Sequence, residues 1–179
     1  SLSHSFSKDY FKKKFEDTHT KDTYQNFEYK TKEDFIADLK HLKSTLNGFN
    51  ITIPYKEAII PYLDVITPEA SAIQAVNCVN VVNDQLIGHN TDYLGFYNSM
   101  KQLLNPKTTS ALVLGTGGAA KAISYALHHL AHIQTTMVST KNGLQYHHLN
   151  ESIIHNHLLI INTTPLGMYP EVDQCPGIP

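Results

Sequence analysis

The 179-residue sequence has little of several features that mark specialised classes of protein. Its two cysteines, Cys78 and Cys175, are too few and too far apart for a disulfide framework or a zinc site. Its longest apolar runs, such as 111–114 and 158–161, are far shorter than the roughly 20 residues that cross a membrane. A formal net charge of −2 offers no basic surface for nucleic acid or acidic lipid. We therefore expect a reduced, cytoplasmic protein with no nucleic-acid or membrane partner.

The composition is that of a folded domain, with 41% hydrophobic and 17% charged residues. This balance excludes a disordered chain, a collagen and a coiled coil. Eleven histidines are present, but no acidic or cysteine ligand accompanies them at a recognised spacing, so we expect no metal.

Strand and helix signals alternate along the chain, which is typical of an α/β protein with a largely parallel sheet. A polar segment at 105–109 suggests a junction between two α/β domains. After it, the pattern predicts a βαβαβ run, the half-unit of a dinucleotide-binding domain. Its elements are expected at 110–115, 117–132, 135–139, 146–155 and 158–162. Before the junction we expect helices at 8–19, 31–45, from 54–56 onward, 68–73 and 91–104, strands at 23–29 and 49–53, and a hairpin of 76–82 with 85–89.

A glycine-rich turn joins the strand 110–115 to the next helix, with the sequence Gly115-Thr-Gly117-Gly118-Ala-Ala120. The first glycine permits a tight turn, and the second lets the backbone approach a pyrophosphate. The exposed N–H groups at the start of a helix attract phosphate. In this setting the turn predicts a dinucleotide site, and the alternative is a tight turn that binds nothing.

The end of the second nucleotide strand bears on the type of cofactor. An NAD site usually has Asp or Glu there to hold the ribose hydroxyls, but residues 137–141 include no acid. Hydroxyl groups and Lys141 suit a 2′-phosphate better, which favours NADP. The alternative is that Lys141 is an ordinary solvated loop lysine.

Three polar residues of the first half stand where a fold alone would not require them. Lys56 follows a strand that stops at Pro54 and would lie in the first turn of a helix, where the dipole disfavours a cation. If partly buried it could transfer a proton; otherwise it is an exposed lysine. Asp92 is either a functional carboxylate or an ordinary helix cap. Asn77 interrupts the apolar strand 76–82, which is unusual unless its amide is paired.

Five short motifs follow one another along the chain, with the glycine-rich turn between the fourth and the fifth. They are His4-Ser-Phe-Ser7, Asn50-Ile-Thr52-Ile-Pro54-Tyr-Lys56, Ala75-Val-Asn77, Asn90-Thr-Asp92 and Asn162-Thr-Thr-Pro165-Leu-Gly167-Met168. Together they resemble the motifs of the shikimate dehydrogenase family, over nearly the whole chain. The segment 50–56 is the most specific of them.

The resemblance implies an N-terminal α/β substrate domain over 1–104 and a Rossmann-like NADP-binding domain over 105–179, incomplete because its C-terminal part is absent. It implies a monomer or homodimer that transfers hydride reversibly between NADPH and 3-dehydroshikimate, giving shikimate for aromatic amino acid (chorismate) biosynthesis. Lys56 and Asp92 would be the catalytic pair. The implied substrate-binding residues are Ser5, Ser7, Thr52, Lys56, Asn77 and Asp92. The implied cofactor-binding residues are Gly115, Thr116, Gly117, Gly118, Ala119, Ser139, Thr140, Lys141, Thr163, Thr164, Pro165, Gly167 and Met168.

The sequence also departs from the family pattern. Lys8 replaces a usual proline, and Gln74 and Cys78 replace the common residues around Asn77. The segment 139–141 lacks the arginine that grips the 2′-phosphate. Alternatives are therefore a quinate/shikimate dehydrogenase that prefers NAD, or a truncated homologue that binds nucleotide or substrate without turnover. The family's C-terminal part would lie beyond the last residue, so we expect a fragment of a larger enzyme.

Overall fold

The computed structural model describes residues 6–170 and 172–179. They form an α/β fold, as predicted, and group into two compact units, Ser1–Lys40 and His41–Pro179. The predicted domain boundary near residue 105 stays a prediction. Among the helices of the described residues, none is long and apolar enough to span a membrane.

The first unit contains helix α1 (Phe6–Asp17) and most of helix α2 (Lys32–Thr45). The strand predicted at 23–29 is wrong, since this segment has no regular secondary structure. Its aromatic rings pack on helical residues instead of forming a strand: Tyr24 stacks on Phe11, with ring centroids 5.1 Å apart, and Tyr29 lies 5.4 Å from Phe35. The aromatic residues that predicted a strand in this segment thus pack against helices.

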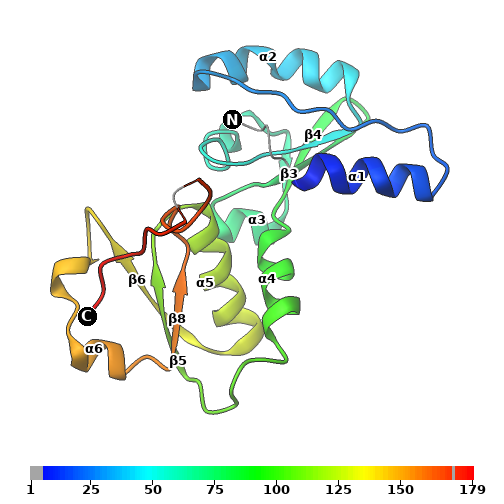
Figure 1. The fold of residues 1–179 in the computed structure, drawn as a ribbon. Coiled ribbons are helices and arrows are strands. Elements are labelled where there is room, and N and C mark those ends of the chain that lie inside the picture. The colour runs from blue at the N-terminus through cyan, green and yellow to red at the C-terminus, as the bar shows by residue number, and fades with distance from the viewer. Residues whose placement is uncertain (1–5, 171) are drawn as a thin grey trace. The chain divides into compact units, whose positions relative to one another are not determined.

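The second unit begins with a four-stranded sheet in the order β1-β3-β4-β2. Its strands β3 and β4 are labelled in Figure 1. The hairpin was predicted correctly: β3 and β4 are antiparallel, and Asn83 and Asp84 between them have positive φ angles of 50° and 58°. Such a turn matches the twist of the two strands. The short helix predicted at 68–73 is also confirmed. The elements are β1 (Gly48–Asn50), the 3₁₀ helix η1 (Ile60–Tyr62), β2 (Val65–Ile66), α3 (Pro68–Ile73), β3 (Cys78–Val82) and β4 (Gln85–His89).

The segment that follows β1 differs from the prediction. The strand expected to reach residue 53 ends at Asn50, and residues 53–59 form successive turns in place of a helix. Ile51 is buried while Ile53 is 70% exposed, so the expected alternation of faces ends here. Pro54 has no N–H group to give to a strand ladder, which explains why no strand continues through it.

The rest of the second unit is helix α4 and an all-parallel sheet in the order β7-β6-β5-β8, with helix α5 (Figure 1). The predicted βαβαβ run is therefore confirmed. Helix α4 stops at residue 100, earlier than predicted, and the two-residue strand β7 was not predicted. The elements are α4 (Asp92–Met100), β5 (Ser110–Leu114), α5 (Gly118–Ala131), β6 (Gln134–Ser139), β7 (Leu144–Gln145), the 3₁₀ helix η2 (Tyr146–His148), α6 (Glu151–His155) and β8 (Leu159–Asn162).

The central strand β5 supplies the core of this sheet, with four of its five residues buried. Ala111 and Val113 on one face pack with Leu127 of α5. Leu112 and Leu114 on the other face pack with residues of β6, η2 and α6. Because β5, β6 and β8 are parallel, their carboxyl ends meet at one edge of the sheet, where α/β proteins bind ligands.

Candidate active site

The glycine-rich turn lies at this edge, between β5 and α5, as the sequence predicts. Gly115 has a φ of +117°, which L side chains rarely adopt, and a Cβ there would lie 2.5 Å from Thr163 Oγ1. Gly117 precedes the first residue of α5, and a Cβ at that position would have no neighbour within 4 Å. The turn therefore leaves open space in front of the start of a helix, where N–H groups and the helix dipole favour an anion.

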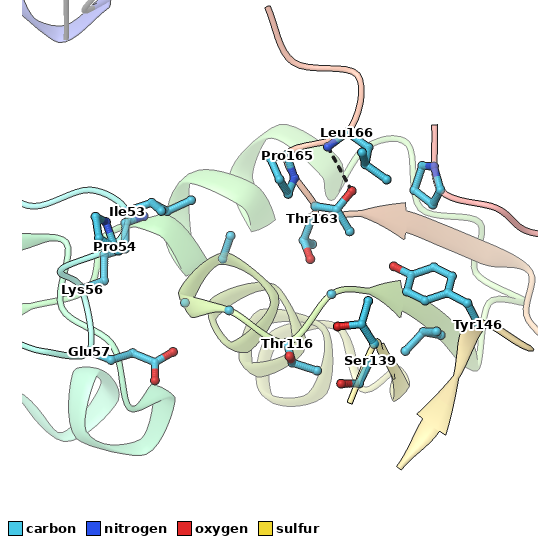
Figure 2. A pocket seen from close by; sticks show the side chains of 18 of the residues that line it. Ile53, Pro54, Lys56, Glu57, Thr116, Ser139, Tyr146, Thr163, Pro165 and Leu166 are labelled. Carbon is cyan, nitrogen blue, oxygen red and sulfur yellow. Dashed lines mark hydrogen bonds between the residues drawn. The ribbon is translucent and has the colours of Figure 1, made fainter. Parts of the chain in front are cut away.

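A cavity of about 880 Å³ extends along this turn. Figure 2 shows residues 53–57 at one end of the view, Ser139 and Tyr146 at the other, and Thr116 between them. The cavity is lined by Ile53, Pro54, Lys56, Glu57, Ala58, Gly115, Thr116, Gly117, Gly118, Ala119, Val138, Ser139, Thr140, Tyr146, Thr163, Thr164, Pro165, Leu166, Pro176 and Gly177. Ten of the thirteen predicted cofactor residues are in this set, and Lys141, Gly167 and Met168 are not.

The loop after β8 forms one wall of the cavity and is shaped by its own side chains. Asn162 Oδ1 accepts hydrogen bonds from the amide and the hydroxyl of Thr164, at 2.9 and 2.7 Å. Asn162 Nδ2 donates to the carbonyl of Leu166 at 3.0 Å. The hydroxyl of Thr163 donates to the carbonyl of Leu114 at 2.6 Å, which ties the loop to the end of β5. Asn162 thus organises the loop, a role that its place in the motif did not reveal.

The residues after β6 form the end of the cavity that lies away from residues 53–57. Ser139 is 8% exposed, and its hydroxyl accepts hydrogen bonds from the backbone amides of Lys141 and Asn142, at 3.0 and 3.3 Å. It therefore closes a tight turn that presents Thr140 to the cavity. Lys141 is exposed beside this end. Tyr146 also lines the cavity, and burial raises the pKa of its hydroxyl.

Lys56, Asp92 and Asn77 come together although they lie far apart in the sequence. Lys56 Nζ donates to Asp92 Oδ2 at 2.7 Å, and Asn77 Nδ2 donates to Asp92 Oδ1 at 2.7 Å. The side chain of Lys56 is 16% exposed and that of Asp92 33%, so the pair is partly screened from water. Both carboxylate oxygens of Asp92 are occupied, which fixes the direction of the carboxylate.

The base of the hairpin brings these three residues together. The amide of Val76 donates to the carbonyl of Lys56 at 2.8 Å, and the amide of Asn77 donates to the carbonyl of His89 at 3.0 Å. Asn90 is 4% exposed; its Nδ2 donates to the carbonyl of Ala75, and its Oδ1 accepts from the amide of Asp92. Lys56 therefore lies in a turn held against the segment before β3, and not in the helix that the sequence predicted.

The other predicted residues lie elsewhere. Ser5 lies outside the described residues, and Ser7 lies in α1 of the first unit. Thr52 is exposed in the turn that precedes Lys56. Gly167 has a φ of +87°, and Met168 after it is 61% exposed. Sequence reasoning missed the cavity residues Ile53, Pro54, Glu57, Ala58, Val138, Tyr146, Leu166, Pro176 and Gly177.

The histidines within residues 6–170 and 172–179 are spread over several helices, strands and loops. Within the part of the chain that the structure describes, no group of three or more histidine, cysteine, aspartate or glutamate side chains could hold a metal ion. Two of the histidines have structural contacts instead: Nδ1 of His155 and of His157 each lie 2.7 Å from a backbone carbonyl four residues earlier.

Comparison with known proteins gives consistent matches. Residues 1–79 match the family model described as the shikimate dehydrogenase substrate binding domain. A shikimate dehydrogenase (NADP(+)) of Clostridium beijerinckii is 36% identical over 98% of this chain and 68% of its own length. The chain thus spans about two thirds of the length of that relative.

Solved structures of shikimate dehydrogenases have folds similar to that of this chain. A shikimate dehydrogenase from Peptoclostridium difficile is 34% identical, with a TM-score of 0.80 over 99% of this chain and 69% of its own. A shikimate 5-dehydrogenase from Thermus thermophilus, solved in complex with NADP(H) and shikimate, is 29% identical, with a TM-score of 0.85 over 99% and 70%. The motifs, the parallel sheet with its glycine-rich turn and these matches lead to one conclusion: the chain belongs to the shikimate dehydrogenase family.

Proposed function

We propose that the protein catalyses the reversible, NADPH-dependent reduction of 3-dehydroshikimate to shikimate. The observation that carries this proposal is the position of Lys56, which lines the cavity at the glycine-rich turn and contacts Asp92 at 2.7 Å. This position supports a proton-transfer role for Lys56 beside a dinucleotide site. The names of the relatives, shikimate dehydrogenase (NADP(+)), support the choice of substrate and cofactor.

The residues present suit a dinucleotide. The cavity volume of about 880 Å³ is toward the upper end of the roughly 300–1,000 Å³ usual for ligand sites. The start of α5 faces it through Gly117, which offers space and backbone N–H groups to a pyrophosphate. The hydroxyls of Thr116, Thr140 and Thr164 provide polar contacts along its length. A mostly apolar wall with a few polar groups is typical of a cofactor site.

When bound, the nicotinamide of NADPH would supply the hydride, and the chain's own residues would place the substrate and move the proton. A carbonyl oxygen that gains negative charge needs a proton donor, and Lys56 Nζ could donate to it. In the oxidation direction, Lys56 would accept the proton from the substrate hydroxyl. Asp92, held by Asn77, would keep the lysine in place and accept a hydrogen bond from a second substrate hydroxyl.

The resemblance supports the remaining assignments. Ser5, Ser7, Thr52 and Asn77 would bind the carboxylate and hydroxyls of the substrate, and residues 1–104 would form the substrate domain. Residues 105–179 would hold the cofactor. A site that pairs hydroxyl groups discriminates strongly against analogues that lack them. A cytoplasmic protein that acts as a monomer or homodimer in aromatic amino acid biosynthesis is part of the same proposal.

We expect the preference for NADP over NAD to depend on the positive charge of one lysine, Lys141. All 14 basic residues of the sequence are lysines, so no arginine can grip the 2′-phosphate. Lys141 follows the cavity residues Ser139 and Thr140 and is the basic side chain nearest to them along the chain. We therefore expect Lys141 to supply the positive charge for the 2′-phosphate.

The test is an assay of the purified protein with shikimate and either NADP or NAD, followed by the absorbance of the reduced nicotinamide. We expect turnover with NADP and a lower kcat/KM with NAD, and Lys141→Glu should reverse this order. A higher kcat/KM with quinate and NAD would identify the quinate-type enzyme. Binding of NADP without any turnover would favour the non-catalytic homologue over the enzyme.

A further inference from the structure

An ion pair next to the candidate catalytic lysine joins the segment after Lys56 to helix α5, whose first residues line the cavity. Lys121 Nζ lies 2.9 Å from Glu57 Oε1. Glu57 follows Lys56 directly and lines the cavity. Lys121 lies near the start of α5, the helix that follows the glycine-rich turn. Sequence reasoning found neither residue, because the partners come from opposite halves of the chain.

The same part of α5 also touches Lys56 itself. A Cβ at Gly118 would lie 3.4 and 3.5 Å from Lys56 Cδ and Cβ, and 3.3 Å from Ala75 Cβ. Ala122, one turn further on, is buried in a cluster with Ile73 and Ala75. The first turns of α5 therefore contact Lys56 through Gly118 and the next residue, Glu57, through Lys121.

We propose that Glu57 and Lys121 are positioning residues, which fix the turn that bears Lys56 against the helix that receives the cofactor. This inference rests on the proposed function, since it assigns the pair a role in the same reaction. The geometry gives the reason: residues 53–59 form turns and not a strand or helix, and the backbone hydrogen bond from Val76 holds Lys56 only toward the segment before β3. The pair of Glu57 and Lys121 adds a side-chain contact from the next residue to α5. A displacement of about 1 Å at a reacting group can cost up to about 10²-fold in rate.

The pair could instead be an ordinary surface ion pair. The side chains of Lys121 and Glu57 are 29% and 50% exposed, and exposed pairs contribute little to stability. The two interpretations predict different results. An ordinary surface pair would leave kcat unchanged when broken, whereas a positioning pair would lower kcat with little change in stability.

The negative charge of Glu57 should also affect the binding of NADP. Its carboxylate lines a cavity whose turn is suited to an anionic pyrophosphate, and like charges at short range repel. Lys121 offsets that charge. Lys121→Met should therefore weaken NADP binding more than Glu57→Gln does, because the first variant leaves Glu57 uncompensated and the second removes it.

The experiment is a double-mutant cycle of Glu57→Gln, Lys121→Met and the double variant, with Lys121→Arg as the conservative variant. We expect each single variant to lower kcat about tenfold, the double variant to be no slower than the slower single one, and Lys121→Arg to retain most of the rate. The KM for shikimate should change little. Lys43→Met is a matched control, because it breaks ion pairs to Asp64 and Asp84 away from the cavity and should leave kcat unchanged.

A second measurement does not depend on turnover. Reductive methylation of Lys56, followed by mass spectrometry, reports how firmly its amine is held. We expect faster methylation of Lys56 in both single variants than in the wild-type protein and in Lys43→Met. If the wild-type protein shows no dehydrogenase activity, the proposed function fails, and this measurement alone decides whether the pair positions Lys56. Unchanged methylation, or additive effects on kcat in an active enzyme, would overturn the inference.

Discussion

Lys56 and Asp92, 36 residues apart in the sequence, lie with Nζ and Oδ2 2.7 Å apart, and Asn77 holds the other oxygen of the carboxylate at 2.7 Å. The three side chains form a chain of charge-assisted hydrogen bonds, which are stronger than those between neutral groups. The predicted catalytic pair is thus a real contact, although whether it catalyses the reaction stays a prediction.

Replacement of Asp92 by Asn tests the charge of the carboxylate while it keeps the shape of the side chain. The amide could still accept a hydrogen bond from Lys56, but the hydrogen bond would lose the negative charge that strengthens it. We expect kcat to fall by about 10²-fold, in the range usual for loss of an acid–base partner. Steady-state kinetics with NADP and shikimate measures this, with the circular dichroism spectrum as the control for folding. A variant with normal kcat would show that the charge of Asp92 is not needed.

Asn90→Ala should reduce the stability of the fold. Asn90 is 4% exposed and joins the carbonyl of Ala75 to the amide of Asp92. Its loss leaves buried polar groups unpaired, which costs about 1–3 kcal/mol of the free energy of unfolding. Urea denaturation gives the value. Asn98→Ala, in the helix that follows, is the matched control, because Asn98 is exposed and accepts a hydrogen bond from the flexible side chain of Lys101. Equal losses in the two variants would contradict this account.

Two glycines of the same turn should respond differently to replacement by alanine. A Cβ at Gly118 would lie 3.3 Å from Ala75 Cβ, which is a tight contact, and 3.4–3.5 Å from Lys56, which is an ordinary one. Gly118→Ala should therefore shift the start of α5 slightly against Ala75 and the neighbouring Lys56, and lower kcat. A Cβ at Gly117 meets no atom within 4 Å, so Gly117→Ala should leave the stability unchanged but raise the KM for NADP, since the methyl group would occupy space meant for the pyrophosphate. Kinetics with varied NADP separates the two effects. The same effect of both variants on kcat and KM would refute the distinction.

The two cysteines should react at different rates with an alkylating reagent. Burial raises the pKa of the Cys78 thiol, so less of the reactive thiolate is present at neutral pH, whereas Cys175 is exposed. We expect Cys175 to be alkylated first at pH 7, and the rate at Cys78 to rise only at a pH above the usual range for a thiol. Mass spectrometry of the modified peptides at several pH values measures both rates. Equal rates at neutral pH would contradict the burial of Cys78.

Local signals predicted much of the fold. The apolar strand 110–114, the glycine-rich turn and the helix after it follow from the order of residues alone, as does the hairpin with Asn83 and Asp84 at its turn. In these elements, periodicity and turn chemistry indicate the same structure. The strand expected at 23–29 failed because its aromatic residues pack on helices, a tertiary preference that strand propensity does not contain.

The candidate site was predictable in its members but not in its geometry. The motifs identified Lys56 and Asp92, but the contact between them depends on hydrogen bonds of Val76 and Asn77 that join distant segments. The same limit hid the pair of Glu57 and Lys121, since no local pattern links residues from two halves of a chain. Cofactor binding by Ser139 stays a prediction, and its hydrogen bond to the amide of Lys141 could not be read from the sequence.

The most direct test of this account is the turnover of Lys56→Ala with shikimate and NADP. Because Lys56 is the proposed proton-transfer group, its loss should lower kcat by about 10²–10⁴-fold and change the KM for shikimate little. The dissociation constant for NADP, measured by fluorescence titration, should stay near the wild-type value and show that the cavity is intact. A kcat close to that of the wild-type protein would contradict the role of Lys56 and the mechanism built on it.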